Sequence, residues 1–166
     1  MGFGENSSFL AILSHFSICT FNPMLSKKAK YALKALLYLT KKADKGLVLI
    51  SDIASEERIP RKFLEAILVD LKTHGILQST RGKNGGYSLA KDPGQVSVGN
   101  VIRMIDGPLA AIPCVSHLYY RKCDECIDEE TCEIRQVMKK VRDATAAILD
   151  TTYLSDLQQI NTLLNE

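Results

Sequence analysis

Residues 50–89 decide the fold, and they read ISDIASEERIPRKFLEAILVDLKTHGILQSTRGKNGGYSL. The first segment predicts a short helix, because the Ser51 hydroxyl can accept a hydrogen bond from a free N–H group of the first turn. Pro60 suits the start of a second helix, where its missing N–H costs nothing. Gly75 is the residue expected just past the end of that helix. The second helix carries an apolar stripe at helical spacing, made by Phe63, Leu64, Ile67, Leu68 and Leu71.

A β-hairpin is predicted directly after the second helix. Residues 76–80 and 87–89 have strand character, and they flank a turn that reads RGKNGG. Two helices, a tight turn and a basic hairpin indicate a winged helix-turn-helix, a module that places its second helix in the DNA major groove. The simpler interpretation is a small α/β packing unit with a solvated charged face.

The residues expected to meet double-stranded DNA lie on the outer side of the second helix and in the hairpin turn. Helix-turn-helix proteins read base edges with N-terminal residues of this helix. The turn glycines let the backbone approach phosphates or a minor groove. Lysines at the start of a preceding helix, over residues 26–42, either touch the DNA backbone or are solvated. The candidates are Lys28, Arg61, Lys62, Ala66, Arg81, Lys83 and Asn84.

Charge divides the chain into a basic and an acidic part. Residues 24–91 hold 14 Lys and Arg against 6 Asp and Glu, whereas residues 92–166 hold 7 against 12. A basic half suits a polyanion such as DNA. The length of 166 residues and the 46% hydrophobic content are those of one ordinary globular domain with an extension. No apolar run reaches the roughly 18 residues that span a membrane, so we expect a cytoplasmic protein without a membrane partner.

The predicted fold class is mostly α with a small β-wing. Residues 1–23 are interpreted as an N-terminal extension upstream of a natural start at Met24, because the organised pattern begins there. Residues 24–108 form the winged helix-turn-helix domain, and within them Ser97 can cap another helix that Gly107 and Pro108 stop. Residues 109–128 form a cysteine-rich sensor loop, and residues 129–166 form a dimerisation helix and a C-terminal tail.

A long helix is predicted over residues 129–150, and it carries a second apolar pattern. Its apolar residues recur at spacings of three, four, three and four, which is the seam of a two-helix coiled contact. The alternative is packing within one subunit. Few other long helices are available to cover the seam, so it favours a homodimer. The seam residues are Ile134, Val137, Val141, Ala144 and Ile148.

The chain resembles the Rrf2 family of bacterial transcriptional regulators, which includes iron–sulfur, nitric-oxide and cysteine-metabolism regulators. The matching words are LSKKAKYALKALLYL, ISDIA, IPRKFLEAIL, LKTHGILQSTRGKNGGYSLA and VSVGNVIRMIDGP. The wing word RG-x-x-GGY-x-L is quite specific. The resemblance implies a homodimeric winged-helix protein joined through its long C-terminal helix. By position it also implies DNA contacts by Lys62, Phe63, Ala66, Arg81 and Lys83; some members have a Gln where this chain has Ala66.

Four cysteines crowd into residues 114–132 and form the candidate metal site: Cys114, Cys123, Cys126 and Cys132. No export signal accompanies them, and clustered thiolates in a reducing cytosol are more often metal ligands than disulfides. An iron–sulfur cluster, of the 2Fe-2S or the 4Fe-4S type, is the leading interpretation. The alternatives are tetrahedral zinc, a metal-free thiol–disulfide switch between Cys123 and Cys126, and unreactive cysteines.

The resemblance supports this site in part. Cluster-binding relatives carry three cysteines in this loop, and Cys126 and Cys132 match the last two. Cys123 lies too near and Cys114 too far to match the first. Some relatives add a His where this chain has Arg135, and others add an acidic residue where it has Lys30, so the fourth cysteine can replace the missing ligand.

Taken together, these patterns predict a DNA-binding transcriptional regulator that responds to redox, iron–sulfur or nitric oxide status, and not an enzyme. A thiol oxidoreductase is the first competing class, but the C-x-x-C does not follow a strand in a βαβ pattern. A metal-storage or interaction module is the second, and the wing glycines and the basic half argue against it.

Overall fold

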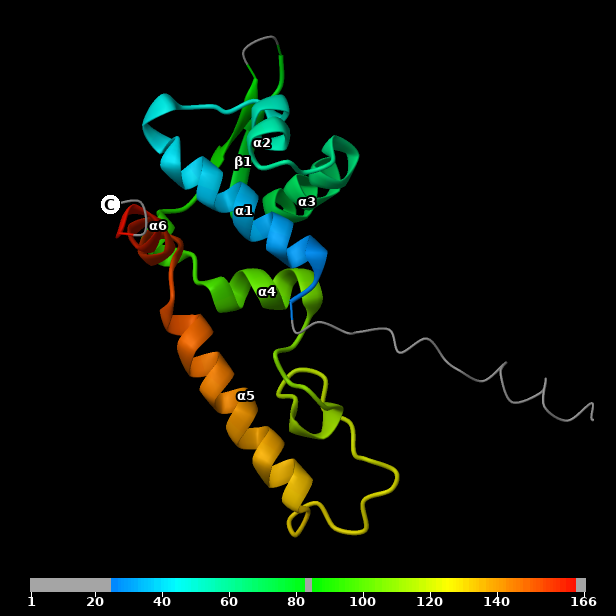
Figure 1. Ribbon diagram of the computed structural model, residues 1–166. Coiled ribbons are helices and arrows are strands. Elements are labelled where there is room, and N and C mark those ends of the chain that lie inside the picture. Colours follow the sequence, from blue (N-terminus) through cyan, green and yellow to red (C-terminus); the bar gives the residue numbers. More distant parts are fainter. Residues whose placement is uncertain (1–24, 83–84, 164–166) are drawn as a thin grey trace, which may run out of the picture.

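The computed structural model describes residues 25–82 and 85–163. In these residues the fold is mostly α-helical with one two-stranded antiparallel sheet, as predicted (Figure 1). The winged-helix half is formed by α1, α2, α3, β1 and β2, and α4 lies beneath it. The long helix α5 extends away from that half. The elements are α1 (Lys27–Lys41), α2 (Ile50–Glu56), α3 (Arg61–Thr73), β1 (Leu77–Thr80), β2 (Gly86–Leu89), α4 (Val98–Asp106), α5 (Glu133–Thr151) and α6 (Leu154–Leu163).

Serine caps begin two of the helices at the positions that the sequence indicates. The Ser26 hydroxyl accepts a hydrogen bond from the Ala29 N–H, and the Ser97 hydroxyl accepts one from the Asn100 N–H. Ser26 also donates its backbone N–H and its hydroxyl to the Asp106 carboxylate at the end of α4, at 2.9 and 2.5 Å. One serine therefore starts α1 and ties it to α4.

The predicted cap of α2 is wrong. This helix begins at Ile50 with Leu49 in the capping position, and Ser51 lies inside its first turn. The Leu49 carbonyl accepts hydrogen bonds from the Asp52 and Ile53 N–H groups, so the helix starts two residues earlier than a Ser51 cap would place it. The Ser51 hydroxyl instead donates to the Asp52 side chain at 3.0 Å.

Helix α3 has the predicted bounds, with Pro60 in the capping position and Gly75 just beyond the C-cap His74. Gly75 has a φ of 69°, the left-handed conformation that glycine adopts at little cost. The Gly75 and Ile76 N–H groups donate to the Lys72 and Leu71 carbonyls, which closes the helix end. The chain then turns directly into β1.

The wing is the predicted hairpin, and a third segment pairs with it. Leu77 is opposite Leu89 and Thr80 is opposite Gly86 in the antiparallel register. Val48 forms an isolated bridge with Tyr87, and the backbone hydrogen bonds between them measure 2.8 and 2.9 Å. A Cβ on Gly86 would lie 2.6 Å from the Val48 carbonyl oxygen, so glycine is required where the two backbones cross.

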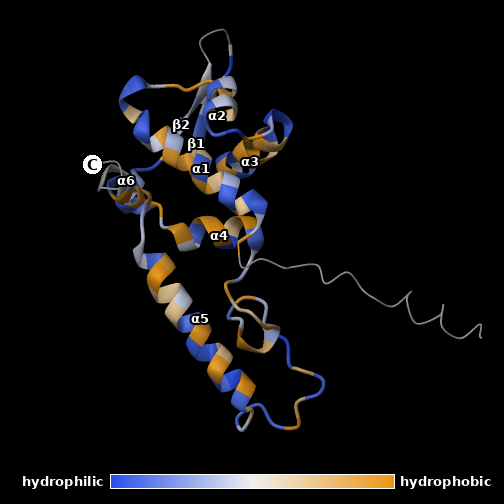
Figure 2. Cartoon of the chain, in the orientation of Figure 1, coloured by the Kyte–Doolittle hydropathy of each residue, from blue (hydrophilic) through white to orange (hydrophobic). Residues whose placement is uncertain are grey.

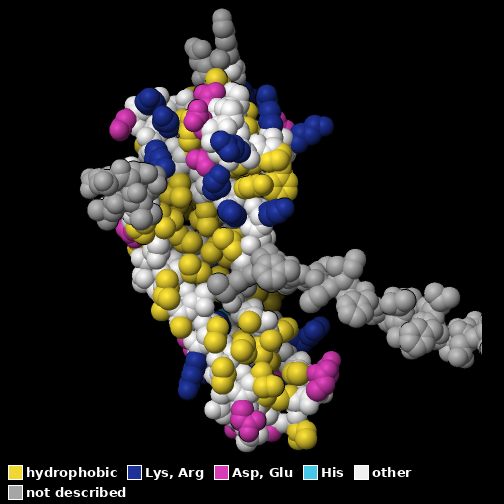
Figure 3. All heavy atoms as spheres, in the orientation of Figure 1, with side chains coloured by type: hydrophobic (Ala, Val, Ile, Leu, Met, Phe, Trp, Pro, Cys, Tyr) yellow, Lys and Arg dark blue, Asp and Glu magenta, His cyan; other side chains and the backbone are white. Residues whose placement is uncertain are grey.

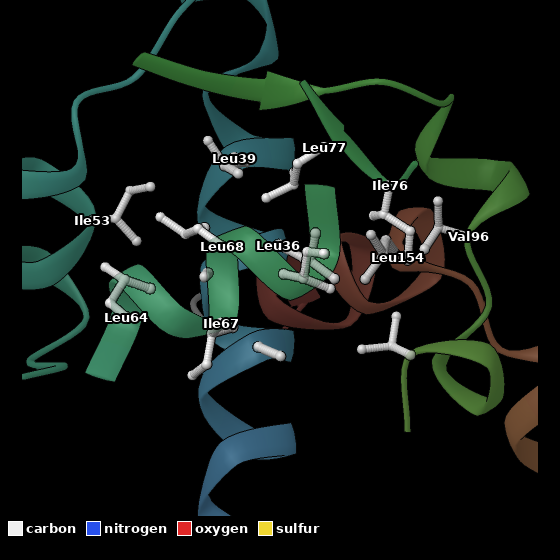
Figure 4. Packing of buried hydrophobic residues seen from close by; sticks show 14 of the residues in the cluster. Leu36, Leu39, Ile53, Leu64, Ile67, Leu68, Ile76, Leu77, Val96 and Leu154 are labelled. Atoms are coloured by element: carbon white, nitrogen blue, oxygen red, sulfur yellow. The ribbon is translucent and has the colours of Figure 1, made fainter. Parts of the chain in front are cut away.

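The core lies where α1, α2, α3, the wing and α6 meet (Figure 4). Three residues of the buried stripe of α3 are labelled in Figure 4, and α1 lies against them. They are Leu64, Ile67 and Leu68. Leu154 at the start of α6 is fully buried, so the chain returns to the winged-helix half after α5. Phe63 is the one member of the predicted stripe that stays exposed, at 41%. The fully buried members are Leu64, Ile67, Leu68 and Leu71.

Helix α5 starts four residues later than predicted, at Glu133 with Cys132 in its capping position. Before it, the Asp128 carboxylate accepts hydrogen bonds from the Glu130 N–H at 3.1 Å and the Thr131 hydroxyl at 2.9 Å. These bonds hold the acidic residues in a turn that the sequence suggested as the first turn of the helix. Cys132 therefore lies at the junction of the cysteine loop and α5.

Candidate nucleic-acid interface and cysteine loop

The outer face of α3 is open to solvent. Arg61, Lys62 and Ala66 are exposed on it, as expected for residues that approach DNA. The Phe63 ring contacts the Tyr31 ring of α1 edge to face, with centroids 5.8 Å apart. Phe63 therefore packs α1 against α3 and keeps only part of its surface for a partner.

Several cations of the basic half are already paired. Arg61 Nε lies 3.3 Å from Glu65 Oε1 on the same helix, and Lys28 Nζ lies 2.7 Å from Asp70 Oδ2, which joins α1 to α3. Lys34 of α1 similarly holds the α2–α3 turn, because its Nζ lies 2.9 Å from Glu57 Oε2 and donates to the Glu57 carbonyl at 2.7 Å. By contrast, no ion pair or hydrogen bond joins Lys62 to any residue that the structure describes.

The wing places a further cation at its tip. Arg81 follows β1, is exposed, and forms no hydrogen bond or ion pair within the described part of the chain. The other two predicted wing contacts, Lys83 and Asn84, lie outside the described residues. Figure 3 shows Lys and Arg side chains over the winged-helix half, where α1, α2 and α3 are exposed. The unpaired cations Lys62 and Arg81 therefore lie in the half that the charge division marked as basic.

The four predicted metal-ligating cysteines are not gathered at one point. Cys114 is buried at 7% exposure in a short 3-10 turn, η4 (Pro113–Val115), whereas Cys123 is exposed and Cys126 and Cys132 are partly exposed. All four are free thiols. In residues 25–82 and 85–163, no three His, Cys, Asp or Glu side chains come together closely enough to hold a metal ion.

Two of the thiols nevertheless interact. A hydrogen bond to the Cys132 thiol is the largest cause that raises the pKa of Cys126 above its ordinary value. The pKa of Cys123 is raised first of all by its hydrogen bond to Glu125 Oε2, at 3.0 Å. Both groups are therefore held as protonated thiols at neutral pH, and binding a metal would release their protons.

Arginines of α5 fasten the first part of the cysteine loop, and sequence reasoning missed them. Arg135 Nε donates to the Cys114 carbonyl at 3.3 Å, and the Arg142 guanidinium donates to the Val115 carbonyl. Arg142 is only 8% exposed, although it lies on a helix with a polar surface. The seven-residue spacing of these two cations is the signal that could have located them, because it puts both on one helix face.

A second contact fastens the other end of the loop. The Tyr120 hydroxyl donates to the Glu129 carboxylate at 2.7 Å, and this bond is the largest cause that raises the pKa of Tyr120. The segment that carries Cys123 and Cys126 lies between Tyr120 and Glu129. The Tyr120–Glu129 bond thus closes the loop across the segment that carries Cys123 and Cys126.

The apolar seam of α5 is uncovered. Val141 is 45% exposed and Val137 is 54% exposed, and the other seam residues are exposed as well. Hydrophobic residues recur along the helix among hydrophilic ones (Figure 2). Within the described residues, no element covers this seam.

The end of α5 is joined tightly to α4. Arg103 Nη1 lies 2.5 Å from Asp150 Oδ1, and Nη2 lies 2.8 Å from Oδ2. A Cβ on Gly99 would lie 2.1 Å from Asp150 Oδ1, so glycine makes room for this carboxylate. The Val98 N–H donates to the Thr152 carbonyl beside it, at 2.8 Å. Arg103, Asp150 and Gly99 form what we call the α4–α5 clamp.

Two helices joined by a turn, with a wing and an open basic face, define a winged helix-turn-helix DNA-binding protein. A family model described as an iron-dependent transcriptional regulator, Rrf2, matches residues 25–160. The chain belongs to the Rrf2 family of DNA-binding transcriptional regulators, which are not enzymes. No helix in the described ranges is long and apolar enough to cross a membrane.

Individual relatives agree with this assignment. The rrf2-like HTH-type transcriptional regulator of Rhodobacter capsulatus is 43% identical over 137 residues, which cover 81% of this chain and 91% of the relative. The structure of CymR, the global cysteine regulator of B. subtilis, has a TM-score of 0.69 at 27% identity and covers 82% of this chain and 96% of that one. T. potens IscR has a TM-score of 0.65 at 26% identity, covering 82% and 87% of the two chains.

Proposed function

We propose that this regulator is a homodimer that binds an inverted-repeat operator with an affinity set by the chemical state of its cysteine loop. The observation that supports this most directly is the position of α5. Its first residue follows Cys132, its exposed seam can pair with a second copy, and its last turn is clamped to α4. Because chromosomal DNA is the ligand, we place the protein in the bacterial cytoplasm.

We assign the principal DNA contacts to Lys62 on α3 and Arg81 on the wing. Both are exposed cations without a partner among the described residues. The other predicted contacts remain part of the proposal: Arg61 and Lys28 would approach phosphate while they keep their ion pairs to Glu65 and Asp70. The remaining members of the proposed interface are Phe63, Ala66, Lys83 and Asn84.

The cofactor that we propose for the loop is an iron–sulfur cluster, with zinc as the alternative. Thiolates are the ligands that such clusters take, and the description of the matching family names iron. Cys126 and Cys132 already interact, and Cys123 lies three residues from Cys126 on an exposed part of the loop. These residues fit the cofactor in chemistry, although three donors are not yet assembled in the described residues.

The cysteines would have defined roles toward the cofactor. Cys123, Cys126 and Cys132 would hold it, and buried Cys114 is a further candidate ligand. A bound cluster would supply a redox-active iron centre that reacts with oxidants or nitric oxide. Contacts of Glu129 connect the site to α5. Glu129 accepts a hydrogen bond from the Tyr120 hydroxyl of the loop, and it forms an ion pair with Arg135 of α5. Ordering of the loop would therefore change the position of the start of α5.

A metal-free thiol switch is the second candidate, and the interaction of Cys126 with Cys132 favours it. This pair differs from the Cys123–Cys126 pairing that the C-x-x-C spacing suggested. Hydrogen peroxide could take two electrons and two protons from the two thiols, which would form one disulfide and two molecules of water. Either candidate makes Cys126 and Cys132 essential to the response.

The test is anaerobic purification of the parent protein and of the variants Cys126→Ala, Cys132→Ala and Cys114→Ala. Each is assayed for absorption spectrum, iron, sulfide and zinc, and for operator affinity with and without oxidant. We expect the first two variants to lose the metal and the oxidant response, and the result for Cys114→Ala decides whether it is a ligand. If Cys126→Ala and Cys132→Ala match the parent in metal content and in DNA binding, the cysteine loop is not the sensor.

A further inference from the structure

The centre of the outer face of α3 is apolar apart from one lysine. The buried stripe of this helix is formed by Leu64, Ile67, Leu68 and Leu71. At 100° per residue, the line directly opposite that stripe runs through Lys62, Ala66, Val69 and Thr73. All four are exposed, and Val69 exposes 56% of its surface although it is a large aliphatic side chain.

The polar group of Thr73 is already used within the helix. Its hydroxyl donates to the Val69 carbonyl at 2.9 Å. A hydroxyl bonded to its own helix leaves the methyl group as the part of Thr73 that a partner can meet. Ala66, Val69 and Thr73 therefore form a line of methyl groups, which we call the methyl line.

The acidic side chains that flank the methyl line are neutralised. Glu65 is paired with Arg61 at 3.3 Å, and Asp70 is paired with Lys28 at 2.7 Å. A free carboxylate here could accept a hydrogen bond from cytosine, and a free arginine could read guanine. Their pairing leaves Lys62 as the polar group of this line.

We propose that α3 recognises its operator through the C5-methyl groups of thymine, read by Ala66 and Val69, with Thr73 continuing the line. Apolar side chains contact the thymine methyl in the major groove, where no other base carries such a group. Residues 66, 69 and 73 are separated along the helix by about 4.5 and 6 Å. These distances correspond to between one and two base-pair steps of about 3.4 Å. The half-site should therefore contain closely spaced thymines. This inference rests on the proposed DNA-binding face.

Uracil provides the sharpest test, because it pairs like thymine and lacks only the methyl group. A duplex is first selected from a random-sequence pool by the parent protein. Each thymine of that duplex is then replaced singly by uracil, and the dissociation constants are measured at one fixed salt concentration. We expect about fourfold weaker binding at each contacted thymine, which is the factor for about 0.8 kcal/mol of lost methyl burial. Thymines outside the α3 footprint serve as matched controls and should change Kd by less than twofold.

A double-mutant cycle identifies the side chain that makes the contact. It combines each protein substitution with each thymine-to-uracil replacement in the DNA and compares their effects on Kd. Val69→Ser should weaken binding to the thymine duplex and abolish the uracil penalty at one position. Ala66→Gln, which adds an amide suited to adenine, should abolish it at a neighbouring position. Lys62→Ala should weaken the thymine and uracil duplexes equally, because the lysine ammonium does not depend on the thymine methyl group for its contact.

Two results would overturn the proposal in different ways. If no uracil substitution weakens binding by more than twofold while Lys62→Ala still does, the face is correct but the methyl line does not read thymine. If Lys62→Ala and Arg81→Ala together also leave the affinity unchanged, the DNA-binding face itself is misassigned.

Discussion

Arg58, in the turn between α2 and α3, has a left-handed backbone. Its φ is 53°, and it is the only non-glycine residue with positive φ in residues 25–82 and 85–163. Such a conformation costs a side-chain-bearing residue about 1–2 kcal/mol, whereas glycine costs about 0.5–1 kcal/mol through the entropy of the unfolded chain. We expect Arg58→Gly to raise the free energy of unfolding by up to about 1 kcal/mol, measured in urea.

The control for this substitution lies two residues earlier in the chain. Glu56 is exposed and helical, so Glu56→Gly should lower the free energy of unfolding by about 0.5–1 kcal/mol. Opposite signs at the two positions would assign the effect to the backbone conformation. A loss of stability in Arg58→Gly similar to that in Glu56→Gly would contradict this explanation.

Single residues also show which parts of the fold could be predicted from sequence. The helix caps depend on backbone groups that are close in sequence, so the local sequence is enough to predict them. Ser26 and Ser97 accept hydrogen bonds from N–H groups three residues further on, and Gly75 lies just beyond the end of α3. Arg142 could not be predicted, because its partner is the carbonyl of Val115, 27 residues away. Caps and turns were therefore largely foreseen, whereas the contacts that fasten the cysteine loop were not.

At the scale of elements, the winged helix could be predicted from local sequence signals, whereas the sensor loop could not. Helix α3 and the wing are specified by periodicity and turn residues, and their bounds were predicted closely. The start of α5 was missed by four residues, because Asp128 holds the preceding turn through side-chain hydrogen bonds. The four cysteines were recognised from their spacing, but spacing could not show that Cys114 would be buried in η4.

The α4–α5 clamp makes a prediction about pH. The hydrogen bonds from Arg103 lower the pKa of Asp150 below its unfolded value of about 3.9. The carboxylate therefore stabilises the fold fully above about pH 4, and this contribution is lost as the pH falls through the folded pKa. Since the Asp150 side chain is 41% exposed, we expect Asp150→Asn to cost about 1 kcal/mol or less at pH 7. Urea unfolding at pH 7, 5 and 3 should show an equal deficit at the first two and a smaller one at pH 3.

Asp124→Asn is the control for the clamp, because this exposed residue of the cysteine loop has no ion pair with another described residue. Its effect should stay within about 0.5 kcal/mol at all three pH values. An Asp150→Asn deficit that is as large at pH 3 as at pH 7 would show that the carboxylate charge is not its source.

Over the whole molecule, the basic excess of charge and the uncovered seam of α5 lie in different halves. The basic winged-helix half carries the proposed DNA contacts, and the half with α5 and the cysteine loop carries the uncovered seam. In the proposed assembly, each half serves one partner: DNA for the first and a second protomer for the second. The α4–α5 clamp joins them, so a change in how two copies of α5 pair would alter the separation of the two recognition helices.

This arrangement predicts how dimerisation contributes to DNA binding. Val141→Glu puts a charge into the seam of both subunits, yet the side chain is 45% exposed in the protomer, so the single subunit should still fold. An unpaired charge in an apolar contact is strongly disfavoured, and we expect the dimer dissociation constant to rise at least about a hundredfold in sedimentation. Ala147→Glu, at an exposed position of α5 off the seam, is the matched control and should leave the dimer intact.

The DNA measurement then distinguishes a functional dimer from an incidental one. In the proposed assembly the parent dimer engages two half-sites at once, so a duplex with both should bind it far more tightly than a duplex with one. Val141→Glu should lose this advantage and bind the two duplexes with nearly the same, weak affinity, because Lys62 and Arg81 remain in place on each subunit. Ala147→Glu should keep the parent's preference. If Val141→Glu is monomeric in sedimentation but still prefers the full repeat as strongly as the parent, each subunit binds DNA independently of α5, and the seam has another purpose.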